Sequence, residues 1–414
     1  MQGVRGSTVP RATFQGVWLM VGVVLVALNL RPSMAAIGPL LSAIRLDIAM
    51  GFAAASLLTM LPVMTMGLAM FVGMGIARRM GSHRTVMLSL ALIGVATLAR
   101  LFLDSATELI ASAVLAGLGI AMIQALMPGL IKSRFTANVS LCMGLYVTAI
   151  MGGAAIAASF SPMMLAHSGS WRFGLAIWAV LALLALCFWM AQRTAFKDLM
   201  PSGPSRKPSF SRLLRAWTLG VFFGLGTACY TCVLAWLAPY CLENGWSEQA
   251  AGLLLGYLTM MEVVSGLLTP ALANRSRDKR LVLTLLLSLM VLGFMGLILM
   301  PHHFSLLWIG LLGLGIGGLF PMSLIVSMDH HDDPQQAGSL TAFVQGVGYL
   351  IAGLSPLLAG AIRDVTGSFS GAWWSLIGLI AVMLLMVVRF NPRHYAGHLR
   401  GSATPTCIAD EKTA

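Results

Sequence analysis

The sequence has 414 residues, of which 58% are hydrophobic and only 10% are charged. A soluble domain carries about 25% charged residues, so lipid is the expected solvent for most of this chain. The polar segments between apolar stretches reach about 25 residues at most, which leaves no room for an ATP-hydrolysing domain of ~50–200 residues. The sequence also lacks His-Glu-x-x-His, Gly-x-Ser-x-Gly and a phosphate-binding glycine loop followed by Lys. We therefore do not expect an enzyme.

Hydropathy predicts twelve membrane-spanning helices, each near the ~20 apolar residues that cross a bilayer. Their limits are 16–41, 52–76, 85–103, 108–131, 138–163, 172–191, 216–241, 248–272, 281–300, 304–327, 337–361 and 372–390. The first apolar run is too long for the core of a cleavable signal peptide, so we interpret it as a retained helix. The fold class expected is an all-α integral membrane protein.

Residues 192–215 are rich in Pro, Gly and basic residues and predict a linker between two six-helix groups, 16–191 and 216–390. If the N-terminal segment 1–15 is cytoplasmic, 21 of the 26 Lys and Arg residues lie on the cytoplasmic side and four lie on the other side. The remaining one, Arg31, lies within the membrane. The positive-inside rule then places the tail 391–414 in the cytoplasm as well. The net charge of +12 thus reflects topology and not nucleic-acid binding. One cytoplasmic loop, 329–333, is an exception, because it carries three acids and no Lys or Arg.

The two six-helix groups resemble each other. Three blocks recur at an offset of 194 or 196 residues: Gly144, Gly152, Ser161 and Pro162 as Gly338, Gly346, Ser355 and Pro356; Gly117-Leu-Gly-Ile120 as Gly313-Leu-Gly-Ile316; and Ala54, Leu57 and Arg84 as Ala250, Leu253 and Arg280. Two six-helix repeats are the architecture of secondary transporters whose binding site lies between the halves near the membrane midplane.

Several specific strings point to a known family: Asn29-Leu-Arg-Pro32, Gly38-Pro-Leu-Leu41 and residues 57–67, 128–132, 216–224 and 345–353. They resemble the cyanate-transporter-like branch of the major facilitator superfamily, a branch that includes a nitroimidazole exporter. The resemblance covers nearly the whole chain. It implies a multi-pass transporter of the inner membrane, two rocking halves and a small, cyanate-like anion as substrate. The alternative is an exporter of neutral aromatic compounds such as nitroimidazoles. We expect a monomer whose partners are lipid and a small-molecule substrate.

The superfamily's loop between helices two and three normally reads G-x-x-x-D-R-x-G-R-R/K. In this sequence Arg79 and Gly81 match that pattern, and Arg78 replaces the acid. We therefore do not infer the charge relay usually given to that acid. Arg79, Gly81 and the following Arg84 are predicted to belong to a gating loop on the cytoplasmic side.

Arg31 is the sharpest candidate for substrate binding. If the first helix begins near Gly16, Arg31 lies about 22 Å along it, within a hydrocarbon layer of about 30 Å. A permanent charge there should face a watery cavity, where its planar fork suits a small anion. The alternative is that the helix ends near Leu30 and Arg31 extends to the membrane surface. Asn29 lies about 200° away on the helix, so it reaches the same site only if Pro32 distorts the turn, and otherwise bonds to another helix.

Glu262 is the only acid predicted deep in the membrane, about 18 Å into the eighth helix. Apolar surroundings favour the neutral form of a carboxyl group, so Glu262 is a candidate for proton coupling. The alternatives are an ion pair with Arg31 or a protonated group that only forms a hydrogen bond.

Further polar residues lie within the helices that the resemblance places around the cavity. Gln124 and Gln345 offer amides for a substrate or for helix–helix bonds, and Tyr146 and Tyr349 are predicted to line the pocket. Arg100 and Lys132 lie near helix ends and are expected to extend toward the membrane surface. The loop 329–333 is interpreted as a helix cap and not as a metal site, and we expect no metal and no cofactor.

Overall fold

The computed structural model describes residues 11–48, 52–192, 210–273 and 278–392. Within these ranges the regular secondary structure is entirely helical. The predicted N-terminal segment 1–15, linker 192–215 and tail 391–414 lie largely outside the described residues, as does the side chain of Arg78.

The first half of the chain forms one bundle. Its helices are α1 (Arg11–Leu28), α2 (Pro32–Ala35), α3 (Ile37–Ile48), α4 (Phe52–Met80), α5 (Ser82–Ala99), η1 (Arg100–Phe102), α6 (Ala106–Arg134), α7 (Val139–Ser168), α8 (Trp171–Ala176) and α9 (Trp178–Ala191). The first predicted span is therefore built from three helical pieces, and the sixth from two.

The second half forms a second bundle. Its helices are η2 (Phe210–Arg212), α10 (Leu214–Glu243), α11 (Glu248–Ala273), α12 (Arg280–Leu299), α13 (Ser305–Met328), α14 (Pro334–Thr366) and α15 (Ser370–Val388). Among the described residues, eleven segments are long and apolar enough to cross a membrane, and α4 contributes a shorter apolar stretch, Met60–Gly73. The predicted all-α membrane fold is confirmed, with helix limits within a few residues of those expected.

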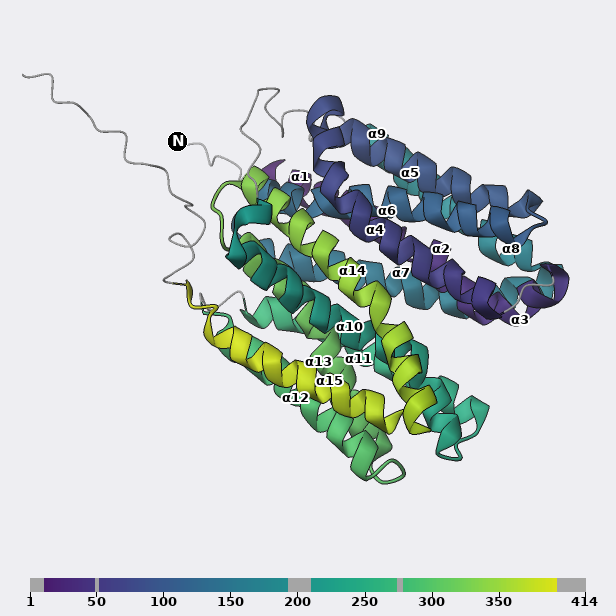
Figure 1. The fold of residues 1–414 in the computed structure, drawn as a ribbon. Helices are drawn as coiled ribbons and strands as arrows, with labels where there is room; N and C mark the ends of the chain where they lie inside the picture. Colours follow the sequence, from purple (N-terminus) through teal and green to yellow (C-terminus); the bar gives the residue numbers. More distant parts are fainter. Residues whose placement is uncertain (1–10, 49–51, 193–209, 274–277, 393–414) are drawn as a thin grey trace, which may run out of the picture.

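The two bundles meet mainly where α14 packs on α4 and α6 and where α11 packs on α7. The first bundle ends at residue 192 and the second begins at residue 210, both at the same end of the molecule. We call this end the linker end. Figure 1 shows the two bundles side by side near the linker end and diverging toward the opposite end. The opposite end contains α3, α8 and the turn between α10 and α11.

Glycines allow the backbones of the two bundles to approach closely. A Cβ on Gly129 of α6 would lie 3.3 Å from the Cα of Gly338 of α14, and one on Gly67 of α4 would lie 3.1 Å from the carbonyl oxygen of Gly346. On the other side of the interface, a Cβ on Gly144 of α7 would lie 3.2 Å from the Pro270 ring of α11. These contacts lie between the middle of the interface and the linker end, so that end is closed.

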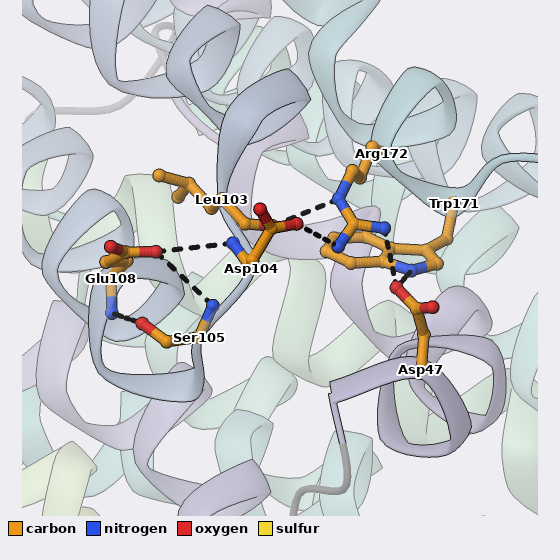
Figure 2. A network of polar contacts seen from close by, with 7 residues as sticks. All are labelled: Asp47, Leu103, Asp104, Ser105, Glu108, Trp171 and Arg172. Carbon is orange, nitrogen blue, oxygen red and sulfur yellow. Dashed lines mark hydrogen bonds and ion pairs between the residues drawn. The ribbon is translucent and has the colours of Figure 1, made fainter.

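At the opposite end, a polar network fixes the first bundle to itself (Figure 2). Arg172 of α8 forms ion pairs with Asp47 of α3 at 2.5 Å and with Asp104 at 2.8 Å, and the indole N–H of Trp171 donates to Asp47 at 3.0 Å. These hydrogen bonds from Trp171 and Arg172 lower the pKa of the Asp47 carboxyl below its ordinary value. Nearby, Ser105 and Glu108 form a capping box that begins α6.

Candidate functional site

The first membrane span breaks at residues 29–31, near its middle. Pro32 begins α2 and disfavours a helical conformation at Arg31, whose backbone has φ −125° and ψ −24°. The Arg31 carbonyl then accepts hydrogen bonds from the amides of Met34 at 3.0 Å and Ala35 at 2.9 Å. The two sequence interpretations were a continuous helix and a helix that ends near Leu30. The structure shows neither, because the helix breaks and then restarts within the same apolar span.

The Arg31 guanidinium extends from this break into the space between the bundles. The side chain is half-buried, its Nε is buried without a hydrogen-bond partner, and it forms no ion pair with a described residue. Its charge acts electrostatically on the hydroxyl groups of Tyr146 of α7, Tyr230 of α10 and Tyr349 of α14. Arg31 is thus a cation that has no counter-charge among the described residues and that lies among tyrosines from both bundles.

Asn29 points elsewhere. Its side-chain amide donates to the carbonyl of Leu25 in α1 at 2.7 Å and to that of Leu181 in α9 at 3.3 Å. The structure therefore separates Asn29 from Arg31, and the bond to α9 corresponds to the interhelical alternative.

Glu262 lies on α11 and is 2% exposed, and its buried Oε1 has no hydrogen-bond partner among the described residues. It lines a pocket together with the aromatic residues Phe222, Phe223, Tyr230 and Phe320. In the described residues, no ion pair joins Glu262 to Arg31, so the ion pair considered from sequence is not formed in this conformation.

The two amides predicted to contact substrate are close to each other. Gln345 of α14 donates to the backbone carbonyl of Gln124 of α6 at 3.3 Å, and the Tyr349 hydroxyl donates to the Gln124 side-chain oxygen at 3.2 Å. All three side chains are at most 1% exposed. They bond the two bundles to each other beside the pocket, near the middle of the interface.

Four buried polar atoms around this region lack a partner among the described residues, and they come from the break in the first span, from α7 and from α11. They are Arg31 Nε, the Tyr146 hydroxyl, Thr148 Oγ1 and Glu262 Oε1. Buried polar groups are normally paired, so a cluster of unpaired donors and acceptors is suited to a polar solute or to water. Sequence reasoning missed Thr148; a hydroxyl in the middle of the fifth predicted span was the signal that could have found it.

At the linker end, Lys132 reaches from one bundle to the other. Its Nζ donates to the carbonyl of Met328, the last residue of α13, at 2.6 Å and also to the carbonyl of His331. The charges of Asp329, Asp332 and Asp333 surround the same ammonium group. Lys132 was expected to lie at the cytoplasmic membrane surface; it lies at the linker end, where the end of α13 and the loop 329–333 hold its ammonium group.

The groups around Lys132 are perturbed by the closed interface. Burial raises the pKa of Asp329, and the nearby ammonium groups of Lys279 and Lys132 oppose that shift. Burial and the charge of Lys132 lower the pKa of His331, with Asp333 and Asp332 acting in the opposite direction. The loop 329–333 therefore faces Lys132, which explains its acidic character on an otherwise basic side.

The predicted gating residues lie on the surface of the linker end. Arg79 and Arg84 are exposed at the end of α4 and the start of α5. Gly81 between these helices has φ +85°, a conformation that favours glycine. The structure does not bring these residues close to the central site.

Two helical bundles with a polar site between them, closed at one end and divergent at the other, define a membrane transport protein. Residues 19–353 match the family model described as Major Facilitator Superfamily, and the chain belongs to that family.

Curated relatives support the same assignment. The chain is 39% identical over 377 residues to the cyanate transport protein CynX of Escherichia coli strain K12, covering 90% of this chain and 97% of the relative. It is 31% identical over 373 residues to the 2-nitroimidazole transporter of the same organism, covering 89% and 93%. The resemblance to the cyanate-transporter-like branch is therefore confirmed.

Solved structures show the same fold. The proton:xylose symporter XylE, bound to 6-bromo-6-deoxy-D-glucose, has a TM-score of 0.73 at 13% identity, covering 91% of this chain and 96% of that one. FucP in the outward conformation has a TM-score of 0.71 at 14% identity, covering 90% and 99%.

Proposed function

We propose that this protein is a secondary active transporter of a small anion of the cyanate type. The anion binds between the two bundles, and access alternates between the two sides of the membrane. In this scheme the linker end is cytoplasmic, as the basic loops predict, and the structure represents the state open to the outside of an inner membrane. The similarity to a cyanate transport protein over nearly all of both chains supports the substrate class.

The observation that carries this proposal is the half-buried Arg31 guanidinium, whose Nε is unpaired and which has no counter-charge in the part of the chain that the structure describes. A fixed cation in a site of low dielectric constant attracts a small anion, and its fork can donate two parallel hydrogen bonds. The unpaired Tyr146 hydroxyl is a further donor to the same ligand. Gln124, Gln345 and Tyr349 would orient the anion after exchanging their mutual hydrogen bonds for bonds to it.

Transport of a labelled anion tests the assignment of Arg31. We expect proteoliposomes with the wild-type protein to accumulate radiolabelled cyanate, and Arg31→Gln to lower kcat/KM by about 100-fold, as loss of a charged hydrogen-bond donor predicts. Arg31→Lys should retain a part of the activity, because it keeps the charge without the fork. Arg134→Gln, which removes an exposed charge at the linker end, is the matched control. Normal uptake by both Arg31 variants would rule out the anion site.

A second candidate function is export of neutral aromatic compounds. The pocket beside Glu262 is lined by four aromatic side chains, which suits stacking on a flat ring, and the similarity to a 2-nitroimidazole transporter points in the same direction. Binding to Arg31→Gln distinguishes the two functions: a neutral nitroimidazole would bind equally well to the wild type and to this variant, whereas cyanate would bind much more weakly to the variant than to the wild type.

Glu262 is the proposed proton carrier of the cycle. It is the acid in the pocket, and its unpaired Oε1 is free to exchange a proton with a polar solute. We expect Glu262→Gln to abolish accumulation driven by a pH gradient while anion exchange continues. Asp364→Asn, at an acid whose side chain is 77% exposed, should behave as wild type. Unchanged pH-driven accumulation in Glu262→Gln would exclude coupling through this residue.

A further inference from the structure

Arg100 is a fully buried arginine that the central site does not account for. It is the first residue of η1, where α5 ends, and it is 0% exposed, while its neighbour Phe102 is 78% exposed. The sequence analysis placed its charge at the membrane surface, and that prediction is wrong. A guanidinium keeps its proton in proteins, so its burial in a membrane bundle is costly and indicates a specific task.

The partners of Arg100 are neutral. Its Nη1 donates to the backbone carbonyl of Ser33 at 2.7 Å, and its Nε donates to the hydroxyl of Ser112 in α6 at 3.1 Å. Its Nη2 is buried without a partner, and it forms no ion pair with a described acid. Asp47 and Asp104, acids of the same bundle, pair with Arg172. Arg100 therefore serves to hold backbone and not to neutralise a carboxylate.

The carbonyl that Arg100 holds belongs to the turn that carries Arg31. Ser33 is the second residue of α2, directly after the break in the first span. The amides of Met34 and Ala35 both donate to the Arg31 carbonyl, so residues 31–35 form a single hydrogen-bonded turn. A bond that fixes the Ser33 carbonyl thus also fixes the backbone from which the Arg31 side chain extends.

The break is also held from its other side. Gly153 of α7 lies so close to the carbonyl of Leu28, the last residue of α1, that a Cβ at this position would clash with it. The interrupted helix is thereby confined between α7 and the guanidinium of Arg100. Irregular backbone within a membrane persists only where the protein satisfies its polar groups.

We propose that Arg100 is a positioning residue for anion binding. By donating to the Ser33 carbonyl, it holds the α2 turn in place and aims the Arg31 guanidinium at the space between the bundles. This inference rests on the proposed function as far as affinity is concerned, but its structural part does not depend on any substrate. A displacement of about 1 Å in a binding group can cost up to 100-fold in activity, so a residue remote from the anion can control its affinity.

Two measurements on Arg100→Met test this role. Without substrate, hydrogen–deuterium exchange in this variant should be faster than in the wild type in peptides covering residues 28–37. In all other peptides of the two bundles it should equal that of the wild type. The KM for cyanate in proteoliposomes should rise by about tenfold to 100-fold with a much smaller change in kcat. A purely structural role would instead accelerate exchange throughout the first bundle and lower the amount of active protein without changing KM.

Three further variants sharpen the test. Arg100→Lys can keep one bond to the Ser33 carbonyl and should show a smaller rise in both exchange and KM. Ser112→Ala removes the acceptor of Nε and the bond that Ser112 donates to the Leu109 carbonyl, but it leaves the bond to Ser33, so its rise in KM should be smaller than that of Arg100→Met. Arg134→Met removes an exposed arginine of the same bundle and should change neither measurement. If Arg100→Met does not yield a monodisperse protein, the comparison of Arg100→Lys with Arg134→Met decides.

The outcomes separate this inference from the proposed function. Wild-type KM and unchanged exchange in residues 28–37 of Arg100→Met or Arg100→Lys would overturn the positioning role, even if the protein transports cyanate. Absence of cyanate uptake by the wild type would overturn the proposed function. Faster exchange in residues 28–37 of Arg100→Met would even then support the conclusion that Arg100 fixes the α2 turn.

Discussion

The two ends of the bundle interface are held by different kinds of interaction. At the linker end, each bundle bonds to the other: Lys132 donates to the end of α13, and Gly129 packs on Gly338. At the opposite end, the ion pairs described stay within one bundle, Arg172 with Asp47 and Asp104 in the first and Arg363 with Glu243 in the second. The bundles are thus stiffened separately at one end and joined at the other.

This difference shows where the free energy of a conformational change resides. Opening the linker end must break bonds and close packing between the bundles, whereas the opposite end can close without breaking the ion pairs that stiffen each bundle. The equilibrium between the two states should therefore respond strongly to changes at the linker end and weakly to changes at the opposite end.

Gly129→Leu is expected to have the largest effect. Already a Cβ at this position lies 3.3 Å from the Cα of Gly338 and 3.1 Å from the Pro334 carbonyl, so a larger side chain should force the linker end open at a cost of about 3 kcal/mol to the closed state. Electron–electron distances between spin labels at Met80 and Leu281, exposed on opposite bundles at this end, should lengthen. Gly252→Leu, at a glycine with free space, is the control and should leave the distance unchanged.

Lys132→Met should shift the same equilibrium by a somewhat smaller amount. The variant loses charged hydrogen bonds to two carbonyls of the second bundle, a loss of about 1.5–3 kcal/mol for the closed linker end. The Met80–Leu281 distance distribution should gain a longer component, and Lys132→Arg should restore most of the short one. A distribution identical to wild type would show that packing alone closes this end.

Arg172→Gln tests the opposite end and should act on stability only. Each partly exposed ion pair contributes about 0–1 kcal/mol, so loss of two should lower the thermal unfolding temperature slightly. The distance between labels at Leu46 and Val365, exposed at this end, should not change. Arg363→Gln is the matched change in the second bundle. A large shift in either distance distribution would contradict independent stiffening of the bundles.

The smallest expected effect is a pH dependence through His331. Burial and Lys132 lower its pKa in the closed state, so the closed linker end is favoured while His331 is neutral. That contribution is present above the ordinary value of about 6.5 and is lost as pH falls through the lowered one. Acidification from pH 7.5 to pH 5.5 should therefore populate the longer Met80–Leu281 distance slightly more in wild type than in His331→Asn. Equal pH responses of the two proteins would exclude His331 as the titrating group.

The helices could be predicted from the sequence because lipid imposes length and apolarity on each span, and the family could be predicted from specific sequence strings. Arg31 and Glu262 stood out because charged residues are rare within membrane spans. Sequence reasoning failed for Arg100 and did not find the partners of Lys132, since both residues lie near predicted helix ends and only tertiary packing reveals what they contact. The acids of the loop 329–333 were conspicuous in the sequence as an exception to the charge rule. Their meaning depends on Lys132, which is remote in the chain, and no local pattern reveals that pairing.

The contact between Gly129 and Gly338 has a consequence for leakage. Backbone meets backbone there, with a Cβ on Gly338 only 3.0 Å from the Cα of Gly129. Such a junction leaves no room for water between the two backbones at this point, and a widened contact in Gly129→Leu is therefore expected to let a solute gradient dissipate faster between turnovers.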